Sequence, residues 1–201
     1  MESLVFIFDK IGIFAFAFVG VSHGVKKKLD VFGLLIVGCM TAVGGGMIRD
    51  ACLGRIPYAL SHGEYLLFAV IASILSIIFY HFHLRIPTLF LLIADTFGLA
   101  AFAVSGANVA IGASLSILVV IFFAMLTSAG GGLLREIILN EIPFIFRTEI
   151  YATAAGIGAV LLYVLVMMGV GIDIASGIAL VTIIAIRFYS LSRNINLPVL
   201  R

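Results

Sequence analysis

Long apolar runs, separated by short polar connections, dominate the chain and predict helices that cross a membrane. A helix needs about 20 mostly apolar residues to span the hydrocarbon of a bilayer. Pro57, Pro87 and Pro143 fall in the connections, where proline disturbs a helix least. The connections leave no room for a soluble domain. We therefore expect an all-α integral membrane fold, one domain over residues 1–201, with seven transmembrane helices near residues 4–23, 31–53, 64–82, 88–109, 113–139, 149–169 and 172–191.

The composition supports a bilayer as the solvent of this chain. Hydrophobic residues make up 63% of the 201 residues and charged residues 11%, with a mean hydropathy of +1.29. A soluble domain carries about 25% charged residues. The net charge of +2 comes without a basic patch interleaved with aromatics, so we expect no nucleic-acid partner. Cys39 and Cys52 have no Cys/His cluster around them, and no nucleophile–base pair is visible. We expect no metal site, no cofactor and no enzyme activity.

Lysine and arginine are unevenly distributed between the two sets of connections, which indicates the orientation of the chain. Short cytoplasmic loops are rich in these residues. One set of connections carries Arg55 and little else. The bias predicts a multi-pass protein of the cell inner (plasma) membrane, with its N-terminus outside and its C-terminus cytoplasmic. The basic residues of the cytoplasmic set, with two histidines beside them, are Lys26, Lys27, Lys28, His81, His83, Arg85, Arg147, Arg193 and Arg201.

The chain repeats itself at an offset of 86 residues. At this offset Asp9 aligns with Asp95, "GGGMIRD" at 44–50 aligns with "GGGLLRE" at 130–136, and Ile56-Pro57 aligns with Ile142-Pro143. Residues 9–57 need no gap, and 15 of these 49 positions are identical in the second copy. Apolar sequences match often by chance, but charges, prolines and a glycine triplet in one register do not. The repeat therefore indicates an internal duplication.

Each copy holds three of the expected spans. Since three is odd, the second copy enters the membrane from the opposite side, and the two copies are inverted repeats. We assign the first repeat to residues 4–87, the second to 88–170, and the seventh span with the C-terminal tail to 171–201. Inverted repeats are common in transporters, where the functional site lies near the midplane at the repeat interface.

The glycine triplets interrupt the second and fifth spans. Each glycine inside a helix costs about 1 kcal/mol relative to alanine, so three in a row favour a kink or an unwound segment. Freed backbone at membrane depth must face protein or water, which predicts a polar cavity between these spans. The alternative is close packing, because small residues let membrane helices approach each other. The residues concerned are Gly44, Gly45, Gly46, Gly130, Gly131 and Gly132.

Two charged pairs, Arg49-Asp50 and Arg135-Glu136, follow the triplets. A charge in the hydrocarbon costs at least about 2.5 kcal/mol on insertion scales, so such groups pair or line a water path. Adjacent residues point about 100° apart on a helix. We therefore expect pairs across the repeats, Arg49 with Glu136 and Arg135 with Asp50. The alternative is that the arginines extend to the membrane interface.

Further polar residues are candidates for the same path. Asp9 and Asp95 begin the first and fourth spans, either as acids that favour a helix N-terminus or as carboxylates at the mouths of a cation path. Thr41, Thr127 and Ser128 lie about one turn before the glycines. Their hydroxyl groups either line the path or bond to their own backbone.

The paired motifs "GGGMIRD" and "GGGLLRE", in inverted three-helix repeats followed by a seventh helix, resemble the prokaryotic trimeric intracellular cation (TRIC) channels. That family is also labelled as a bacterial glycine-transporter domain (UPF0126-like) family. The resemblance implies a homotrimer in membrane lipid, with one pore per protomer between the kinked second and fifth helices, through which K⁺ and Na⁺ pass. Animal members carry a Lys-Glu pair after the second triplet, where this chain has Arg135-Glu136.

Two functions follow. In a monovalent cation channel, broken-helix carbonyls and hydroxyls line the path, and the arginines must be neutralised by Asp50 or Glu136 or act as a gate. In a small amino acid carrier, Arg49 or Arg135 holds the carboxylate of a zwitterion such as glycine, and the inverted repeats rock for alternating access. The carrier explains the arginines better, whereas the resemblance favours the channel.

Overall fold

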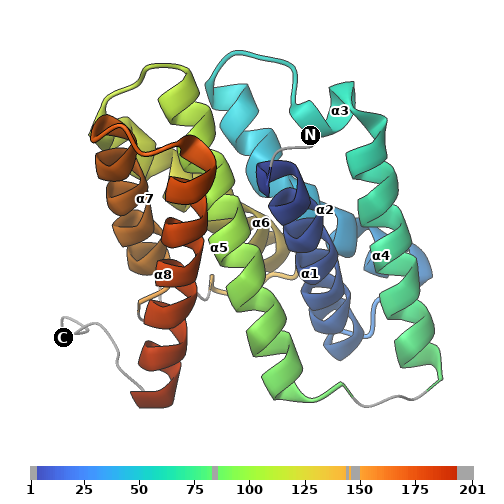
Figure 1. The fold of residues 1–201 in the computed structure, drawn as a ribbon. Helices are drawn as coiled ribbons and strands as arrows, with labels where there is room; N and C mark the ends of the chain where they lie inside the picture. Colours follow the sequence, from blue (N-terminus) through green and yellow to red (C-terminus); the bar gives the residue numbers. More distant parts are fainter. Residues whose placement is uncertain (1–3, 83–85, 144, 146–149, 194–201) are drawn as a thin grey trace.

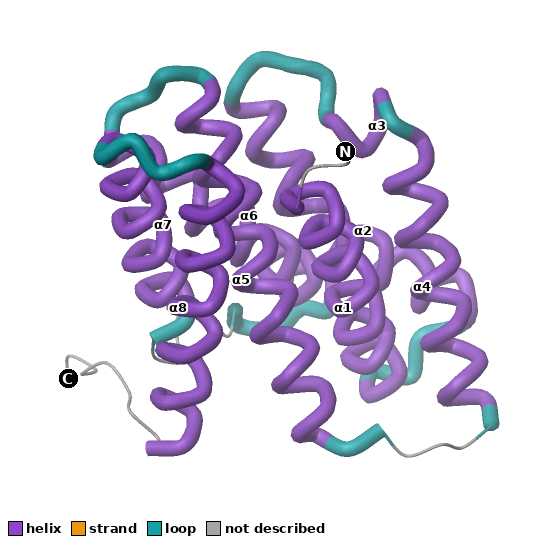
Figure 2. The backbone as a smooth tube through the Cα atoms, viewed as in Figure 1, coloured by secondary structure: helices purple, strands orange, loops and turns teal. Residues whose placement is uncertain are grey.

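The structure, a computed structural model, describes residues 4–82, 86–143, 145 and 150–193. Over these residues the regular elements are helices, as Figures 1 and 2 show. Arg85, Arg147, Arg201 and His83, on which the predicted orientation partly rests, lie outside the described residues. The helices are α1 (Leu4–Lys26), α2 (Val31–Cys52), α3 (Tyr58–Ser61), α4 (Gly63–His81), α5 (Thr88–Gly112), α6 (Ile117–Ile138), α7 (Ala152–Met167) and α8 (Ile172–Arg193).

Five of these helices are long and apolar enough to cross a bilayer, namely α2, α4, α5, α6 and α8. Of the others, α1 has 23 residues and α7 has 16. The helix bounds fall close to the expected spans, with two differences. The short helix α3 was not expected. The span expected from residue 113 begins at Ile117, because Ser114 has a left-handed backbone (φ 56°) that no helix continues through.

Four helices, α1, α2, α5 and α6, form the centre of the fold. The outer helices flank this group: α4 packs on α1 and α2, while α7 and α8 pack on α5 (Figure 1). Alanine is frequent in the buried cluster that joins α5, α6, α7 and α8, with Ala103, Ala107, Ala155 and Ala179 at most 1% exposed. Small side chains let helix backbones come close, which is how membrane helices gain contact without a hydrophobic driving force.

An unwound segment in the second and fifth spans, one of the two forms expected, is wrong, whereas a kink in them stays a prediction. Both α2 and α6 run as continuous helices through their glycine triplets. A Cβ added to Gly45 would collide with the backbone carbonyl oxygen of Thr127, and one added to Gly131 would collide with that of Thr41. The physical reason is that unbroken helices satisfy their own backbone groups in lipid, while the missing side chains allow close packing. These glycines serve a helix crossing, which was the alternative interpretation.

The two helices cross in opposite directions. Thr41 lies opposite Gly131 and Gly45 lies opposite Thr127, so a step forward along α2 is a step back along α6. Residues that follow the triplet in α2 therefore lie on one side of the crossing. Those that follow the triplet in α6 lie on the other side.

Candidate functional site

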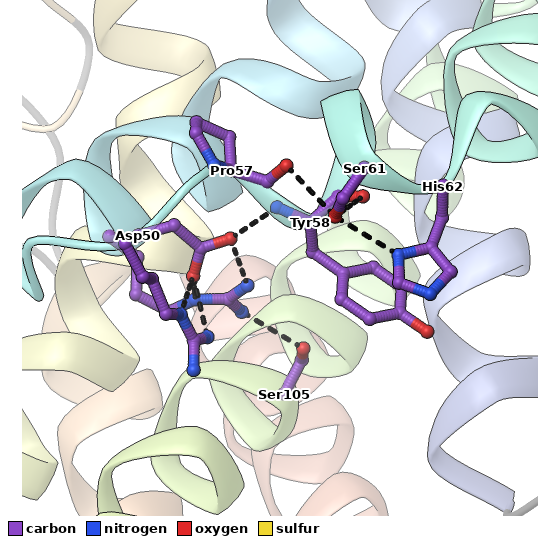
Figure 3. A network of polar contacts seen from close by, with 8 residues as sticks. Asp50, Pro57, Tyr58, Ser61, His62 and Ser105 are labelled. Carbon is purple, nitrogen blue, oxygen red and sulfur yellow. Dashed lines mark hydrogen bonds and ion pairs between the residues drawn. The ribbon is translucent and has the colours of Figure 1, made fainter.

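Asp50, at the end of α2, is the centre of a buried polar network (Figure 3). Its carboxylate accepts hydrogen bonds from Arg49 Nε at 2.8 Å, Arg55 Nη2 at 2.6 Å and the backbone N–H of Tyr58 at 2.8 Å. Arg49 Nη1 also donates to Ser105 Oγ of α5 at 3.3 Å. Asp50 is 1% exposed and Arg49 6%. The charges are thus held by each other inside the protein, which buried ions require.

The second motif pairs in the same manner. Arg135 Nη2 donates to Glu136 Oε1 at 2.6 Å, and both residues are 5% exposed. The expected pairs Arg49–Glu136 and Arg135–Asp50 are therefore wrong. Because α2 and α6 cross in opposite directions, Arg49 and Glu136, which both follow their triplets, lie on opposite sides of the crossing. The alternative, that the arginines extend to the interface, is wrong as well, since both are buried.

A polar cavity of about 390 Å³ lies on the side of the crossing that holds Arg49, and we call it the Asp9 cavity. A smaller space of about 40 Å³ continues it towards the crossing, where Gly46, Phe102 and Thr127 line it. Asp9 lies in α1 beyond the first turn, and its Oδ1 is buried without a hydrogen-bond partner among the described residues. The lining residues of the larger space include Asp9, Arg49, Arg55, Tyr58, Ser105, Asn108 and Asp173.

A second cavity of about 390 Å³ lies on the opposite side, and we call it the Asp95 cavity. Its lining includes the charged residues Lys26, Asp95, Arg135, Glu136 and Glu141. Asp95 also lies beyond the first turn of its helix, α5, and accepts a hydrogen bond from the hydroxyl of Tyr151 at 3.3 Å. Neither aspartate therefore lies in the first turn of its helix, so the interpretation as acids that favour a helix N-terminus is excluded. Each aspartate instead lines one of the two cavities.

The crossing of α2 and α6 separates the two cavities. Its glycines are packed against the facing backbone, with the Cα of Gly45 3.1 Å from the position of a Cβ on Gly130. The rings of Phe16 and Phe102 meet edge to face beside the crossing, with centroids 5.2 Å apart, and are 2% and 8% exposed. The expected polar cavity between the helices is therefore two cavities with a closed apolar contact between them.

The three hydroxyl residues near the glycines differ in what they do. Thr41 Oγ1 donates to Val37 O at 2.6 Å, and Ser128 Oγ donates to Ala124 O at 2.7 Å. These two satisfy their own helix backbone. Thr127 Oγ1 is buried without a partner among the described residues, and Thr127 lines the inner end of the Asp9 cavity.

An ion pair lies at the mouth of the Asp95 cavity. Lys27 Nζ, just after α1, is 2.7 Å from Glu141 Oε1, just after α6, and both side chains are more than a third exposed. The hydrogen bond from Lys27 lowers the pKa of the Glu141 carboxyl. The pair joins the loops that follow α1 and α6.

The structure places near this cavity a charged residue, Arg187, that is not among the predicted site residues. Arg187 of α8 is 1% exposed, and its guanidinium carbon lies 4.8 Å from the ring centroid of Tyr151. Its Nη1 donates to the carbonyl oxygen of Ile150 at 3.2 Å. The sequence contains a signal for it. An arginine inside an apolar run costs free energy when the run enters a membrane, so it indicates a functional residue or one with a structural partner. Tyr151 had a signal too, since it aligns with Tyr65 at the offset of 86 residues.

Comparison with known proteins gives a consistent result. A family model described as "Glycine transporter" matches twice, at residues 6–81 and 92–167, which is the offset at which the sequence repeats. A UPF0126 membrane protein of Deinococcus radiodurans is 39% identical over 96% of this chain and 90% of its own length. The UPF0126 inner membrane protein YadS of Escherichia coli is 36% identical over 97% of this chain and 95% of its own length.

Solved structures share the fold. A structure that addresses conductance through TRIC cation channels has a TM-score of 0.90 and 36% identity, and covers 97% of this chain and 96% of the other. The TRIC trimeric intracellular cation channel orthologue from Rhodobacter sphaeroides has a TM-score of 0.88 and 31% identity, with 96% and 99% covered.

Fold and relatives together define the class: a multi-pass helical membrane protein with the TRIC channel fold. Within that class, the chain belongs to the glycine-transporter (UPF0126) family of membrane proteins. The word transporter comes from the description of the family model, whereas the solved relatives are described as cation channels.

Proposed function

We propose that the chain forms a monovalent cation channel for K⁺ and Na⁺, with a pore in each protomer. The pore runs from the Asp9 cavity, across the crossing of α2 and α6, to the Asp95 cavity. The observation that carries the proposal is the pair of charged cavities on opposite sides of one glycine crossing. It occurs in a fold shared with solved TRIC cation channels at 36% and 31% identity.

The proposal includes a membrane arrangement. Seven helices, α1, α2 and α4 to α8, cross the bilayer, and the repeats 4–87 and 88–170 are inverted. The antiparallel crossing of the equivalent helices α2 and α6 supports the inversion. We place the N-terminus outside and the C-terminus in the cytoplasm of the inner membrane, the location given in the name of the E. coli relative. A homotrimer follows the TRIC relatives, which are described as trimeric.

The charged pairs suit cation passage. A free arginine in a cation path repels the ion, but Arg49 and Arg135 are each held by the neighbouring carboxylate. Asp9 and Asp95 then enrich cations at the two ends of the path. Conduction requires the glycine crossing to loosen, because the two helix backbones are in contact there. The crossing is therefore the proposed gate.

The alternative is a carrier for a small amino acid such as glycine. The closed contact between two separate polar cavities favours this candidate, because alternating access needs each cavity to open in turn. Arg49 or Arg135 would then bind the carboxylate of the zwitterion. In the observed structure both guanidinium groups are already occupied by carboxylates, which is why we prefer the channel.

Recording from purified protein in planar bilayers with potassium salt separates the two functions. A channel gives unitary currents, and Arg135→Ala should change their size or their gating. A carrier gives no unitary currents but saturable glycine uptake into liposomes, and Arg135→Ala should then weaken the affinity for glycine. Uptake without current would refute the channel.

A further inference from the structure

Helix α8 lies outside the repeat and brings two opposite charges to the protomer. Asp173 lies in its first turn, and Arg187 lies four turns further along the same helix. At 1.5 Å per residue the two are about 21 Å apart along the helix axis. The repeat supplies no equivalent of either charge, since α8 follows the second match of the family model, which ends at residue 167.

The acidic end of α8 faces the Asp9 cavity. Asp173 is exposed and lines this cavity together with Asp9, Arg49 and Arg55. The helix is attached to α5 at this end, because Asn108 Nδ2 donates to Ser176 Oγ at 3.0 Å. The position of Asp173 relative to the cavity is therefore fixed by packing.

The basic end of α8 lies behind the Asp95 cavity. Arg187 contacts the face of the Tyr151 ring, and the hydroxyl of Tyr151 donates to Asp95. The chain of contacts thus leads from the buried guanidinium through one ring to the carboxylate that lines the cavity. Arg187 does not line the cavity itself, so it acts on ions there through its charge and not through contact.

The two cavities differ in charge as a result. Two carboxylates, those of Asp9 and Asp173, and two guanidinium groups line the Asp9 cavity. Its small extension adds one further charged residue, the carboxylate of Asp50. The Asp95 cavity also has three carboxylates, set against Lys26 and Arg135. Lys27, paired with Glu141 at the mouth, is a third cation there, and Arg187 adds a fourth behind the cavity. The side with Asp173 therefore carries a net negative charge, while the side with Arg187 does not.

We propose that α8 polarises the pore, so that cation current through each protomer is larger from the Asp9 cavity than from the Asp95 cavity. The inference rests on the proposed channel function. A negative mouth concentrates cations and increases their entry from that side. The helix dipole of α8 opposes this effect, because it puts about half a positive charge at the N-terminal end near Asp173 and about half a negative charge at the C-terminal end. These half charges are smaller than the full charges of Asp173 and Arg187.

The test measures the ratio of the larger to the smaller unitary conductance at equal voltages of opposite sign. This ratio does not depend on the direction in which the protein inserts. Asp173→Asn and Arg187→Gln should each lower it about 1.5- to threefold at about 0.01 M KCl, the effect of one charge at roughly 10 Å. At about 1 M KCl, where the Debye length is about 3 Å, the difference should disappear.

One matched control keeps the positive charge at position 187, and another removes a positive charge elsewhere on α8. Arg187→Lys should retain the wild-type ratio, and so should Arg193→Gln, which removes an exposed arginine at the end of α8. If Arg187→Gln does not fold, Asp173→Asn still decides, because Asp173 is exposed. If Asp173→Asn or Arg187→Gln conducts with an unchanged conductance ratio, or if its change persists in high salt, this inference is overturned while the proposed channel function stands. Wild-type protein without unitary current overturns the channel and this inference together.

Discussion

Replacing Gly45 by alanine tests whether the glycine triplets serve close packing. An added Cβ would meet the carbonyl oxygen of Thr127, closer than real Cβ atoms approach any neighbour. In the next position, a Cβ on Gly46 would meet only Arg49 Nη2, at an ordinary 3.8 Å. The two substitutions are one residue apart in the same helix. They gain the same helix propensity and differ only in what the methyl group touches.

The expected magnitudes follow from this difference. Overpacking costs about 1–3 kcal/mol, and we take the upper end because a backbone carbonyl cannot rotate away. The alanine returns about 1 kcal/mol of helix propensity. Gly45→Ala should therefore lose about 2 kcal/mol, whereas Gly46→Ala should gain about 1 kcal/mol. At about 2–4 °C per kcal/mol for a chain of this size, the midpoints should differ by about 6–12 °C.

The assay follows thermal unfolding in detergent. Because the chain has no tryptophan, the measured quantity is the fraction that stays in a monodisperse size-exclusion peak after heating. The second crossing position provides an internal repeat of the experiment, with Gly131→Ala below Gly132→Ala for the same reason. Equal midpoints within both pairs, or a higher midpoint for the crossing glycines, would refute close packing.

Two further predictions concern ion pairs of different burial. Asp50→Asn should destabilise the protein by about 3–5 kcal/mol, because it leaves buried Arg49 without its partner; Glu64→Gln, at an exposed site, is the control in the same thermal assay. Lys27→Ala should cost less than about 1 kcal/mol, since its pair with Glu141 is exposed. The contribution of that pair is present above pH 4.5, the ordinary pKa of Glu141, and is lost as the pH falls through the lowered pKa of the folded protein. A stability difference between wild type and Lys27→Ala that grows in acid contradicts this sign.

The partners of the charged residues could not be predicted from the sequence, because they depend on how the helices cross. Arg49 and Arg135 were expected to pair across the repeats, because neighbouring side chains on a helix point apart. The structure instead pairs each arginine with the carboxylate next to it. The long arginine side chain spans the difference in direction. The antiparallel crossing removes the distant carboxylate from reach.

Arg187 shows a different limit. Its charge inside an apolar run is visible in the sequence, but its partner depends on how α8 packs. The contact joins α8 to Tyr151, the residue just before α7, and has no counterpart in the spacing along the chain.

The membrane as solvent, the helix positions and the duplication could be predicted from the residues alone, because apolar length and register are local properties of the chain. What the glycines do depends on how α2 and α6 pack against each other. A glycine triplet weakens a helix and also permits close approach, and the same residues satisfy both patterns. The triplet of α2 stays helical and packs against α6 at a distance that leaves no room for a methyl group. The space that the missing side chains leave on each helix is filled by the backbone of the other helix.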